Sequence, residues 1–317
     1  MKYYIGIDLG GTNIAVGVVD ENYKIIKKDS VPTNTEDSDK LVADMAALCR
    51  SLVERSGLSF DDIEYAGIAA PGTVDPVTCE VKYANNIAMF HYPIGEKLKS
   101  LIPLKKVYLE NDANAAALGE AIAGAGKGCK NLVLITLGTG LGGGIVIDGK
   151  LYSGFNYAGA ELGHMVIVAE GRQCSCGRKG CWEAYASASG LINLTKDKMK
   201  ETKDTIMWDI VGGDINKTSG RTAFNAMKQG DKAGAEVVDL YLKYLACGMT
   251  NIVNIFQPEI FCIGGGISNE GDPLLLPVQK YVNDWQYGTH AHDDKTVVKL
   301  ATLKNDAGII GAAVLGL

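Results

Sequence analysis

One glycine-rich turn occurs twice in this chain, and this repeat limits the possible folds more than any other feature. Residues 10–12 (Gly-Gly-Thr) and 138–140 (Gly-Thr-Gly) each separate two runs of β-branched residues, which predicts a β-hairpin at both places. The hairpins align at a constant offset that places Gly10 on Gly138, Val18 on Val146 and Asp20 on Asp148. Such a repeat predicts two related α/β domains, with both turns lining a cleft between them.

The segments between and after the hairpins alternate between helical and strand patterns. Residues 39–55 place Leu41, Met45, Leu48 and Leu52 on one helical face, and Gly57 follows as a stop signal. Further strands are predicted at residues 63–69, 106–109, 260–263 and 297–303, and further helices at residues 113–123, 233–256 and 308–317. This alternation, without a Ser- or Pro-rich linker, predicts an α/β protein whose domains are closely joined.

Composition argues against several classes of protein. The chain has 317 residues, and its net charge of −6 argues against binding nucleic acid or anionic lipid by bulk charge. Asp8 interrupts the first apolar run before a signal-peptide core could form, and the uncharged residues 131–147 contain glycines that fit a buried hairpin better than a membrane span. Eight cysteines without a secretory signal predict reduced thiols. We therefore expect a cytoplasmic protein without a nucleic-acid or membrane partner.

The two glycine turns are candidate phosphate sites. Backbone N–H groups of such a turn can converge on phosphate oxygens, and the hydroxyls of Thr12 and Thr139 can add donors. No Gly-Lys-Ser/Thr follows, and the glycines lead into a strand rather than a helix, so neither turn is a P-loop or a dinucleotide fingerprint. One such turn alone could be only a tight hairpin. Two in register, with a third glycine cluster at residues 264–266, favour a nucleotide site.

Asp8 and Asp112 each follow a predicted strand, where α/β proteins usually place their chemistry. Asp112 also precedes an Ala-rich helix, so a simple helix N-cap is the alternative to a functional role. Beside a phosphate site, a carboxylate at this position can accept the proton of an attacking hydroxyl. Asp8 could hold Mg²⁺ through water, because Mg²⁺ takes few protein carboxylates.

A metal site is predicted in the middle of the chain. His164, Cys174, Cys176 and Cys181 supply three thiolates and one imidazole, the ligand set of a closed structural zinc site. A redox thiol pair is disfavoured because there is no Cys-x-x-Cys, and free surface thiols are an unlikely origin for four ligands so close together. Glu161 and Glu183 flank the site, where the zinc would fix the backbone for carboxylates that grip a polyhydroxy ligand.

Taken together, these motifs resemble the ROK family of sugar kinases, which has the actin-like, hexokinase-related (ribonuclease H-like) ATPase fold. The matching segments occur in the family's order and span most of the chain. They are Asp8-Leu9-Gly10-Gly11-Thr12, Pro71-Gly72, Glu110-Asn111-Asp112-Ala113-Asn114, residues 136–144, Glu161-Leu162-Gly163-His164, and Cys174-x-Cys-x₄-Cys-x-Glu183.

The resemblance, nearest to the family's bacterial glucokinases, implies an ATP:hexose 6-phosphotransferase of carbohydrate metabolism that acts as a homodimer or a dimer of dimers. Asp112 would be the general base, and Asp8 would serve Mg²⁺. Sugar hydroxyls would be bound by Gly72, Asn86, Asn111, Asp112, Glu161, His164 and Glu183, and ATP by Gly10, Gly11, Thr12, Gly138, Thr139, Gly140, Gly264, Gly265 and Gly266. The predicted domains are residues 1–116 with 303–317, and residues 117–302 with the zinc-binding loop 164–181.

Two segments depart from the family pattern, and the choice of sugar stays open. Residues 86–90 read Asn-Ile-Ala-Met-Phe instead of Asn-Leu-x-x-Trp, and residues 205–222 match nothing. Glucose, mannose, N-acetylglucosamine, N-acetylmannosamine and fructose all remain candidate substrates.

The family also contains sugar-responsive repressors, which carry a DNA-binding module ahead of the sugar domain. We expect no such module, since the first predicted strand starts at Tyr3. A non-catalytic sugar-binding protein is disfavoured because both turns and both aspartates are present.

Overall fold

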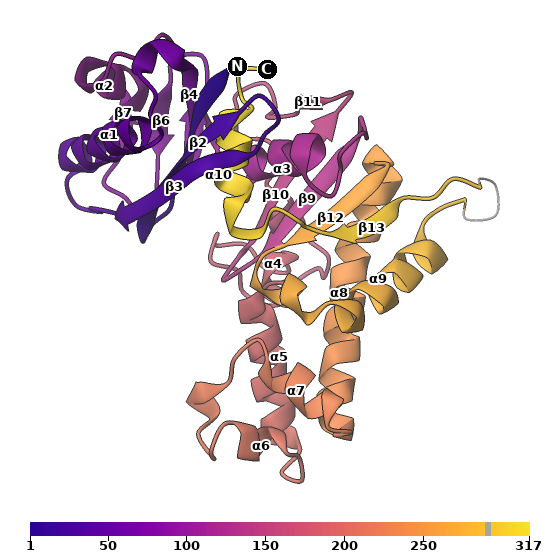
Figure 1. Cartoon of the computed structure of the whole chain (residues 1–317). Coiled ribbons are helices and arrows are strands. Elements are labelled where there is room, and N and C mark those ends of the chain that lie inside the picture. The colour runs from indigo at the N-terminus through magenta and orange to yellow at the C-terminus, as the bar shows by residue number, and fades with distance from the viewer. Residues whose placement is uncertain (289–292) are drawn as a thin grey trace. The chain divides into compact units, whose positions relative to one another are not determined.

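The computed structural model describes residues 1–288 and 293–317, which form two compact units (Figure 1). Unit 1 consists of residues 1–130, 144–160 and 302–317. Unit 2 consists of residues 131–143 and 161–301. The C-terminal segment therefore belongs to the same unit as the N-terminus. The domain bounds predicted from sequence, residues 1–116 with 303–317 and residues 117–302, stay a prediction.

Unit 1 is built on a five-stranded sheet in the order β3-β2-β1-β4-β8. Neighbouring strands β1 to β3 pair antiparallel, whereas β1, β4 and β8 run parallel. The strands are β1 (Tyr3–Leu9), β2 (Asn13–Asp20), β3 (Ile25–Pro32), β4 (Ile63–Ala70) and β8 (Val107–Asn111). The hairpin predicted around residues 10–12 is thus confirmed.

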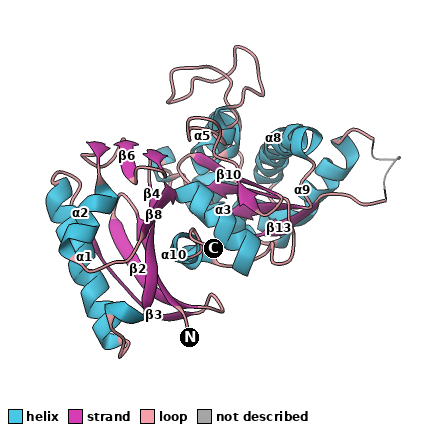
Figure 2. Cartoon of the chain, turned by 90° about the horizontal axis from the view of Figure 1, so that it is seen from above, coloured by secondary structure: helices cyan, strands magenta, loops and turns pink. Residues whose placement is uncertain are grey.

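Alternation along β1 decides what covers each face of this sheet. Ile5, Ile7 and Leu9 belong to one buried cluster with α1 (Ser38–Arg55), whereas Tyr4 belongs to another cluster with α10 (Ala307–Ala313). Successive residues of a strand face opposite sides, so α1 and α10 cover opposite faces of the sheet (Figure 2). The four leucine and methionine positions predicted for the core-facing side of α1 are all buried.

Glycines allow α10 to pack directly on the sheet. A Cβ at Gly6 would overlap the carbonyl oxygen of Ile309, and a Cβ at Gly67 would overlap that of Ala312. The other elements of unit 1 are β5 (Thr73–Asp75), β6 (Glu80–Tyr83), β7 (Phe90–Tyr92), α2 (Ile94–Leu101), α3 (Asp112–Ala123) and β11 (Lys150–Leu151), with 3₁₀ turns at Phe60–Asp62 and Lys304–Asp306.

The second sheet has the order β11-β10-β9-β12-β13, which repeats the layout of the first. A hairpin, β9 (Leu132–Leu137) and β10 (Leu141–Ile147), is followed by β12 (Ile260–Gly264) and β13 (Val297–Leu300). As in unit 1, the first strand of the hairpin runs parallel to the next strand of the sheet, and that strand runs parallel to the last. The duplicated α/β core expected from the sequence repeat is confirmed.

Helices make up most of the rest of unit 2. They are α4 (Glu183–Ala186), α5 (Ala188–Glu201), α6 (Met207–Ile210), α7 (Thr222–Lys228), α8 (Lys232–Phe256) and α9 (Asp272–Trp285), with 3₁₀ turns at Leu162–His164, Ile215–Lys217 and Gly266–Glu270. Trp182 is fully buried against α8, where a Cβ at Gly248 would overlap its ring, and its Nε1 donates to the Tyr244 carbonyl oxygen at 2.9 Å. This contact anchors the start of α4.

The last predicted strand and helix are longer than the observed ones. The strand expected over residues 297–303 ends at Leu300, because the backbone N–H groups of Thr302 and Leu303 donate to the Glu120 carboxylate instead of extending the ladder. The helix expected over residues 308–317 starts at Ala307 and ends at Ala313. Within the residues described, no helix combines the length and apolar character that a membrane crossing needs.

Candidate functional site

The junction between β8 and α3 presents Asp112. Asn111 is the N-cap of α3, and its Oδ1 accepts from the backbone N–H groups of Ala113 at 2.9 Å and Asn114 at 3.2 Å. The alternative interpretation of Asp112 as the N-cap is therefore wrong. Asp112 is the first residue of the helix, and its side chain is exposed. Its Oδ1 accepts from the Ala113 N–H at 2.8 Å, which orients the carboxylate at the positive end of the helix.

Gly72 and Asn111, predicted together from sequence, lie together in the structure. The Asn111 Nδ2 donates to the Gly72 carbonyl oxygen at 3.0 Å. Gly72 has a φ of 87°, and a Cβ there would overlap the Tyr83 carbonyl oxygen, so only glycine fits. Asn86 lies beside the first glycine turn, since a Cβ at Gly11 would come within 3.7 Å of the Asn86 Cβ.

Asp8 shares the end of the unit 1 sheet with Asp112. Burial and the charge of Asp112 raise the pKa of Asp8 to about 6. The Asp8 carboxylate packs against the backbone of Gly308 near the start of α10, and a Cβ at that glycine would overlap it. Two carboxylates close enough to perturb each other mark a place where a cation or a proton is favourable.

The two glycine turns differ in how they are held. In the first, the Gly10 N–H donates to the Asn13 carbonyl oxygen at 3.0 Å, and Gly11 and Thr12 are exposed. In the second, the Gly138 N–H donates to the Gly140 carbonyl oxygen at 3.0 Å, and Gly138 and Thr139 are exposed. Exposed backbone and hydroxyl donors at both turns can bind phosphate oxygens.

The third glycine cluster adjoins the second turn. Gly264 ends β12, and Gly265 has a φ of 82°. A Cβ at Gly265 would overlap the backbone of Leu137, the last residue of β9. Unit 2 therefore brings the predicted residues 264–266 next to the strand that leads into residues 138–140.

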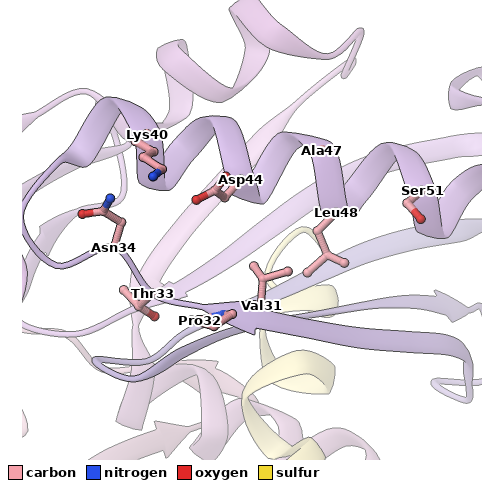
Figure 3. A pocket seen from close by; sticks show the side chains of 9 residues that line it. All are labelled: Val31, Pro32, Thr33, Asn34, Lys40, Asp44, Ala47, Leu48 and Ser51. Carbon is pink, nitrogen blue, oxygen red and sulfur yellow. The ribbon is translucent and has the colours of Figure 1, made fainter.

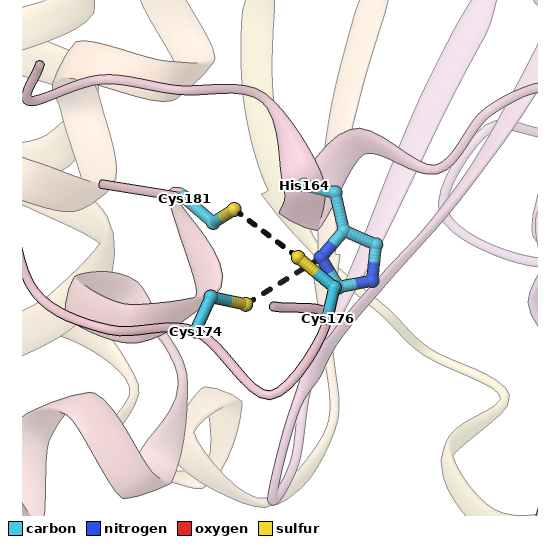
Figure 4. A group of neighbouring side chains, drawn as sticks. All are labelled: His164, Cys174, Cys176 and Cys181. Carbon is cyan, nitrogen blue, oxygen red and sulfur yellow. Dashed lines mark hydrogen bonds between the residues drawn. The ribbon is translucent and has the colours of Figure 1, made fainter. Parts of the chain in front are cut away.

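The four predicted metal ligands converge (Figure 4). Their ligand atoms all lie within 4.8 Å of one another. The Cys176 and Cys181 sulfurs are 3.6 Å apart, and the Cys174 sulfur is 3.7 Å from the His164 Nδ1. Zinc–sulfur bonds of about 2.3 Å in a tetrahedron separate neighbouring ligands by about 3.7 Å. The donor set and its spacing therefore fit one zinc ion.

Glu183 connects this cluster with the second glycine turn. Its Oε2 accepts from the Leu141 N–H at 2.9 Å, and a Cβ at Gly140 would overlap that oxygen. Its Oε1 accepts from the Ser175 hydroxyl at 3.3 Å and lies 3.7 Å from the Cys174 sulfur. Glu161 is exposed, and its carbonyl oxygen accepts from the His164 N–H at 3.1 Å. Both glutamates thus border the metal cluster, as the sequence predicts.

A groove of about 710 Å³ lies between β3 and α1 in unit 1 (Figure 3). It is lined by Val31, Pro32, Thr33, Asn34, Lys40, Asp44, Ala47, Leu48 and Ser51. None of the predicted site residues lines it, so this groove is not the candidate site.

Sequence reasoning gave no role to Glu110, Ser153 or Gly308. Glu110 is almost completely buried at the end of β8, and a charged residue in a buried strand directly before Asn111 was the available signal. Gly308 contacts Asp8 only because α10 returns to the first sheet, which no local pattern indicates.

Comparisons with known proteins agree with this geometry. The profile of the ROK family matches residues 4–317. The glucokinase of Streptomyces coelicolor is 38% identical over 317 residues, covering 99% of this chain and 98% of its own. The N-acetyl-D-glucosamine kinase of Aliivibrio salmonicida is 32% identical over 276 residues, covering 84% and 85%. The crystal structure of a ROK family glucokinase from Streptomyces griseus in complex with glucose and AMPPNP matches with a TM-score of 0.81 and 36% identity, covering 99% and 98%.

Proposed function

Because this chain belongs to the ROK family, we propose that it is an ATP-dependent hexose kinase that phosphorylates the C6 hydroxyl of glucose, giving glucose 6-phosphate and ADP. The observation that carries the proposal is the placement of Asp112, whose carboxylate is exposed at the end of β8 while Asn111 caps the helix. Full-length similarity to the Streptomyces glucokinases supports glucose as the substrate.

Asp112 acts as the general base. Phosphoryl transfer requires mostly positioning and charge stabilisation from the protein, with the proton of the attacking hydroxyl accepted by a nearby carboxylate. The Ala113 N–H holds the Asp112 Oδ1 in place, and the exposed Asp112 carboxylate accepts that proton. The pair of Asn111 and Gly72, held by their own hydrogen bond, positions the sugar beside it.

The remaining sugar contacts come from Asn86, Glu161, His164 and Glu183. Carboxylates accept hydrogen bonds from two neighbouring hydroxyls of a sugar, which suits Glu161 and Glu183 to this task. In the structure Glu183 already binds the Leu141 N–H and the Ser175 hydroxyl, so its Oε1 must exchange partners when sugar binds. A zinc ion bound by His164 and the three cysteines would supply no reactive step and would hold the loop beside Glu161 and Glu183.

ATP binds through backbone and hydroxyl donors of the glycine turns. Gly10, Gly11, Thr12, Gly138, Thr139 and Gly140 would contact the phosphates, and Gly264, Gly265 and Gly266 would lie near the adenosine. Mg²⁺ neutralises the charge of the phosphates when bound. Asp8 would hold the ion through a water molecule, and the positive charge of the ion would favour the ionised form of the Asp8 carboxylate.

A second substrate class comes from the relatives. The N-acetyl-D-glucosamine kinase of Aliivibrio salmonicida shares 32% of its residues with this chain over the aligned part, so an N-acetylated hexose is the alternative to glucose. At position 90 this chain has Phe, whereas the family pattern has Trp. This difference is the sequence feature that bears on the choice between glucose and an N-acetylated hexose. We further propose a cytoplasmic homodimer.

The test is a coupled assay for ADP release with Mg-ATP, across glucose, mannose, N-acetylglucosamine, N-acetylmannosamine and fructose at equal concentration. We expect the highest kcat/KM with glucose. A preference for an N-acetylated sugar would contradict glucose as the substrate and still support the assignment as a hexose kinase. Absence of turnover with all five sugars would contradict the proposed function.

A further inference from the structure

A buried carboxylate lies behind the catalytic segment. Glu110 is only 5% exposed, although ionised side chains are rarely buried unless they are paired. Its Oε1 accepts from the Asn111 N–H at 2.8 Å and from the Asn114 Nδ2 at 3.0 Å. Its Oε2 accepts from the Ser153 hydroxyl at 3.3 Å. All three of these donors are neutral, so the contacts fix geometry rather than balance charge.

Two of these partners, Asn111 and Asn114, flank Asp112 in the sequence. Asn111 directly precedes it, and Asn114 follows within the first turn of α3. The Glu110 carboxylate therefore ties the last residue of β8 to the first turn of the helix, with Asp112 between the two attachment points. The Asn114 amide contributes its Nδ2 to Glu110, while its buried Oδ1 has no hydrogen-bond partner among the described residues. The bond to Glu110 thus determines how this amide is oriented.

The third partner brings in another segment. Ser153 opens the loop of residues 152–160, which follows β11 and precedes Glu161 in the chain. The loop is closed on itself by the Gly159 N–H, which donates to the Ser153 carbonyl oxygen at 2.9 Å. Glu110 thus holds both the segment with the proposed base and the start of the loop that leads to a proposed sugar ligand.

We propose that Glu110 is a positioning residue for phosphoryl transfer, which sets the orientation of Asn111 and Asp112 through the β8–α3 junction. This inference rests on the proposed function. Displacing a reacting group by about 1 Å can lower the rate about a hundredfold, so a rigid junction directly before the base matters for kcat. Glu110 does not touch the reacting atoms and acts only through its neighbours.

Glu120 is a matched control on the same helix. It is completely buried and accepts from backbone N–H groups of Ala125 at 2.7 Å and Leu303 at 2.8 Å, and from Thr302. It lies eight residues after Asp112 in the sequence, about 12 Å along a helix axis. Both glutamates hold backbone segments, but only Glu110 holds the one that carries Asp112.

Substituting glutamine for Glu110 or Glu120 keeps the shape of the side chain and removes its charge. At Glu110, a glutamine oxygen can keep the bonds from Asn111 and Asn114 while its NH₂ group donates to the Ser153 hydroxyl, which accepts equally well. At Glu120, both oxygens accept from backbone N–H groups, so an NH₂ group would face a donor. Glu110→Gln should therefore preserve the junction, whereas Glu120→Gln should lower stability.

The experiment compares kcat, KM for ATP and melting temperature in Glu110→Leu, Glu110→Gln and Glu120→Leu. We expect kcat to fall about tenfold or more in Glu110→Leu with an unchanged KM for ATP, and to stay within about threefold of wild type in Glu110→Gln. Glu120→Leu should lower the melting temperature and keep kcat well below that temperature. The inference is overturned if Glu110→Leu keeps the wild-type kcat, if Glu110→Gln is as impaired as Glu110→Leu, or if Glu120→Leu loses as much kcat.

A further variant and a measurement independent of turnover complete the test. If Glu110→Leu does not fold, Asn114→Ala removes one donor to the carboxylate and should lower kcat severalfold, and an unchanged kcat would overturn the inference. Hydrogen exchange at the amides of Asn111 and Ala113 does not depend on turnover. Exchange should accelerate in the Glu110 or Asn114 variant and not in Glu120→Leu, and the opposite result would overturn the inference even if the protein phosphorylates no sugar.

Discussion

The two glycine turns share a strand layout and differ in the origin of their carboxylates. Each turn belongs to a hairpin that opens a five-stranded sheet of the same strand order. At the first turn, the carboxylate is that of Asp8, which lies on the strand leading into the turn, two residues before Gly10. In the second, Thr136 stands at the matching position, and the carboxylate beside the turn is that of Glu183, 42 residues beyond Leu141. The duplicated core thus carries different chemistry in its two copies.

This difference follows from what each carboxylate contacts. Asp8 lies near Asp112 and against Gly308, a setting that disfavours its ionisation until a cation is present. The Glu183 Oε2 accepts from a backbone N–H of the second turn, and its Oε1 accepts from the hydroxyl next to a metal ligand, so Oε2 is the oxygen that holds this carboxylate at the turn. In the proposed function, Asp8 and Asp112 are the carboxylates that serve the reaction, whereas Glu183 is a ligand contact beside the metal loop.

Asp112→Ala should have the largest effect, because it removes the proposed base from unit 1. We expect kcat to fall by about 10²–10⁴-fold, the usual contribution of a general base. Glucose affinity, measured by calorimetry, should change little, since the other sugar contacts remain. Asp61→Ala, an exposed carboxylate of the same unit, is the control and should behave as wild type. An Asp112→Ala enzyme with near-normal turnover would remove Asp112 from the mechanism.

Loss of the metal should affect the second turn and spare the first. Metal analysis should find about one zinc per chain, and Cys176→Ser should abolish it and lower the free energy of unfolding by more than about 3 kcal/mol. The Leu141 amide, which donates to Glu183, should exchange faster, whereas the Gly10 amide should not. Cys247→Ser, a half-buried thiol outside the cluster, should keep zinc and exchange rates. Equal acceleration at Gly10 and Leu141 would contradict a selective link.

Gly140→Ala should raise the KM for ATP about tenfold, because the new methyl group overlaps the Glu183 carboxylate. Gly138→Ala should have a smaller effect, since a Cβ there meets no atom within 4 Å. The shorter side chain in Glu183→Asp should relieve the overlap, so a double-mutant cycle should give a coupling energy above about 0.5 kcal/mol. Additive effects of the two changes would show that Glu183 does not support this turn.

The features that could be predicted from the sequence are those that depend on local patterns. Both hairpins and the buried face of α1 depend on local patterns, such as the spacing of Leu41, Met45 and Leu48, and these predictions are confirmed. The four metal ligands were predictable because three of them lie within eight residues of one another. The helix cap was an open alternative for Asp112, since Asn111 and Asp112 are both good caps and only the backbone dihedrals decide.

Long-range contacts account for what could not be predicted. The last strand stops at Leu300 because of Glu120, which lies far earlier in the chain. The contact between Gly308 and Asp8, and the bond from Leu141 to Glu183, likewise join residues that no periodicity relates. The roles of the sugar and ATP residues stay predictions for the assays above.

The smallest effect should be a pH dependence that only the first turn shows. The pKa of Asp8 is about 6 in the folded protein, above its ordinary value of 3.8, so ionisation of Asp8 opposes folding. Asp8→Asn cannot ionise. Without Mg-ATP, the Asp8→Asn protein should therefore gain stability relative to wild type as the pH rises from 4 to 7, and lose that gain as the pH falls.

Urea unfolding of both proteins at several pH values between 4 and 8 would measure this difference. Thr136→Val is the matched control, because Thr136 occupies the position of Asp8 in the second hairpin and carries no titratable group. Its effect on stability should be the same at every pH. If Asp8→Asn also shifted stability by a pH-independent amount, the Asp8 carboxylate would already be ionised at low pH. The contrast between the two turns would then lie only in the source of the carboxylate.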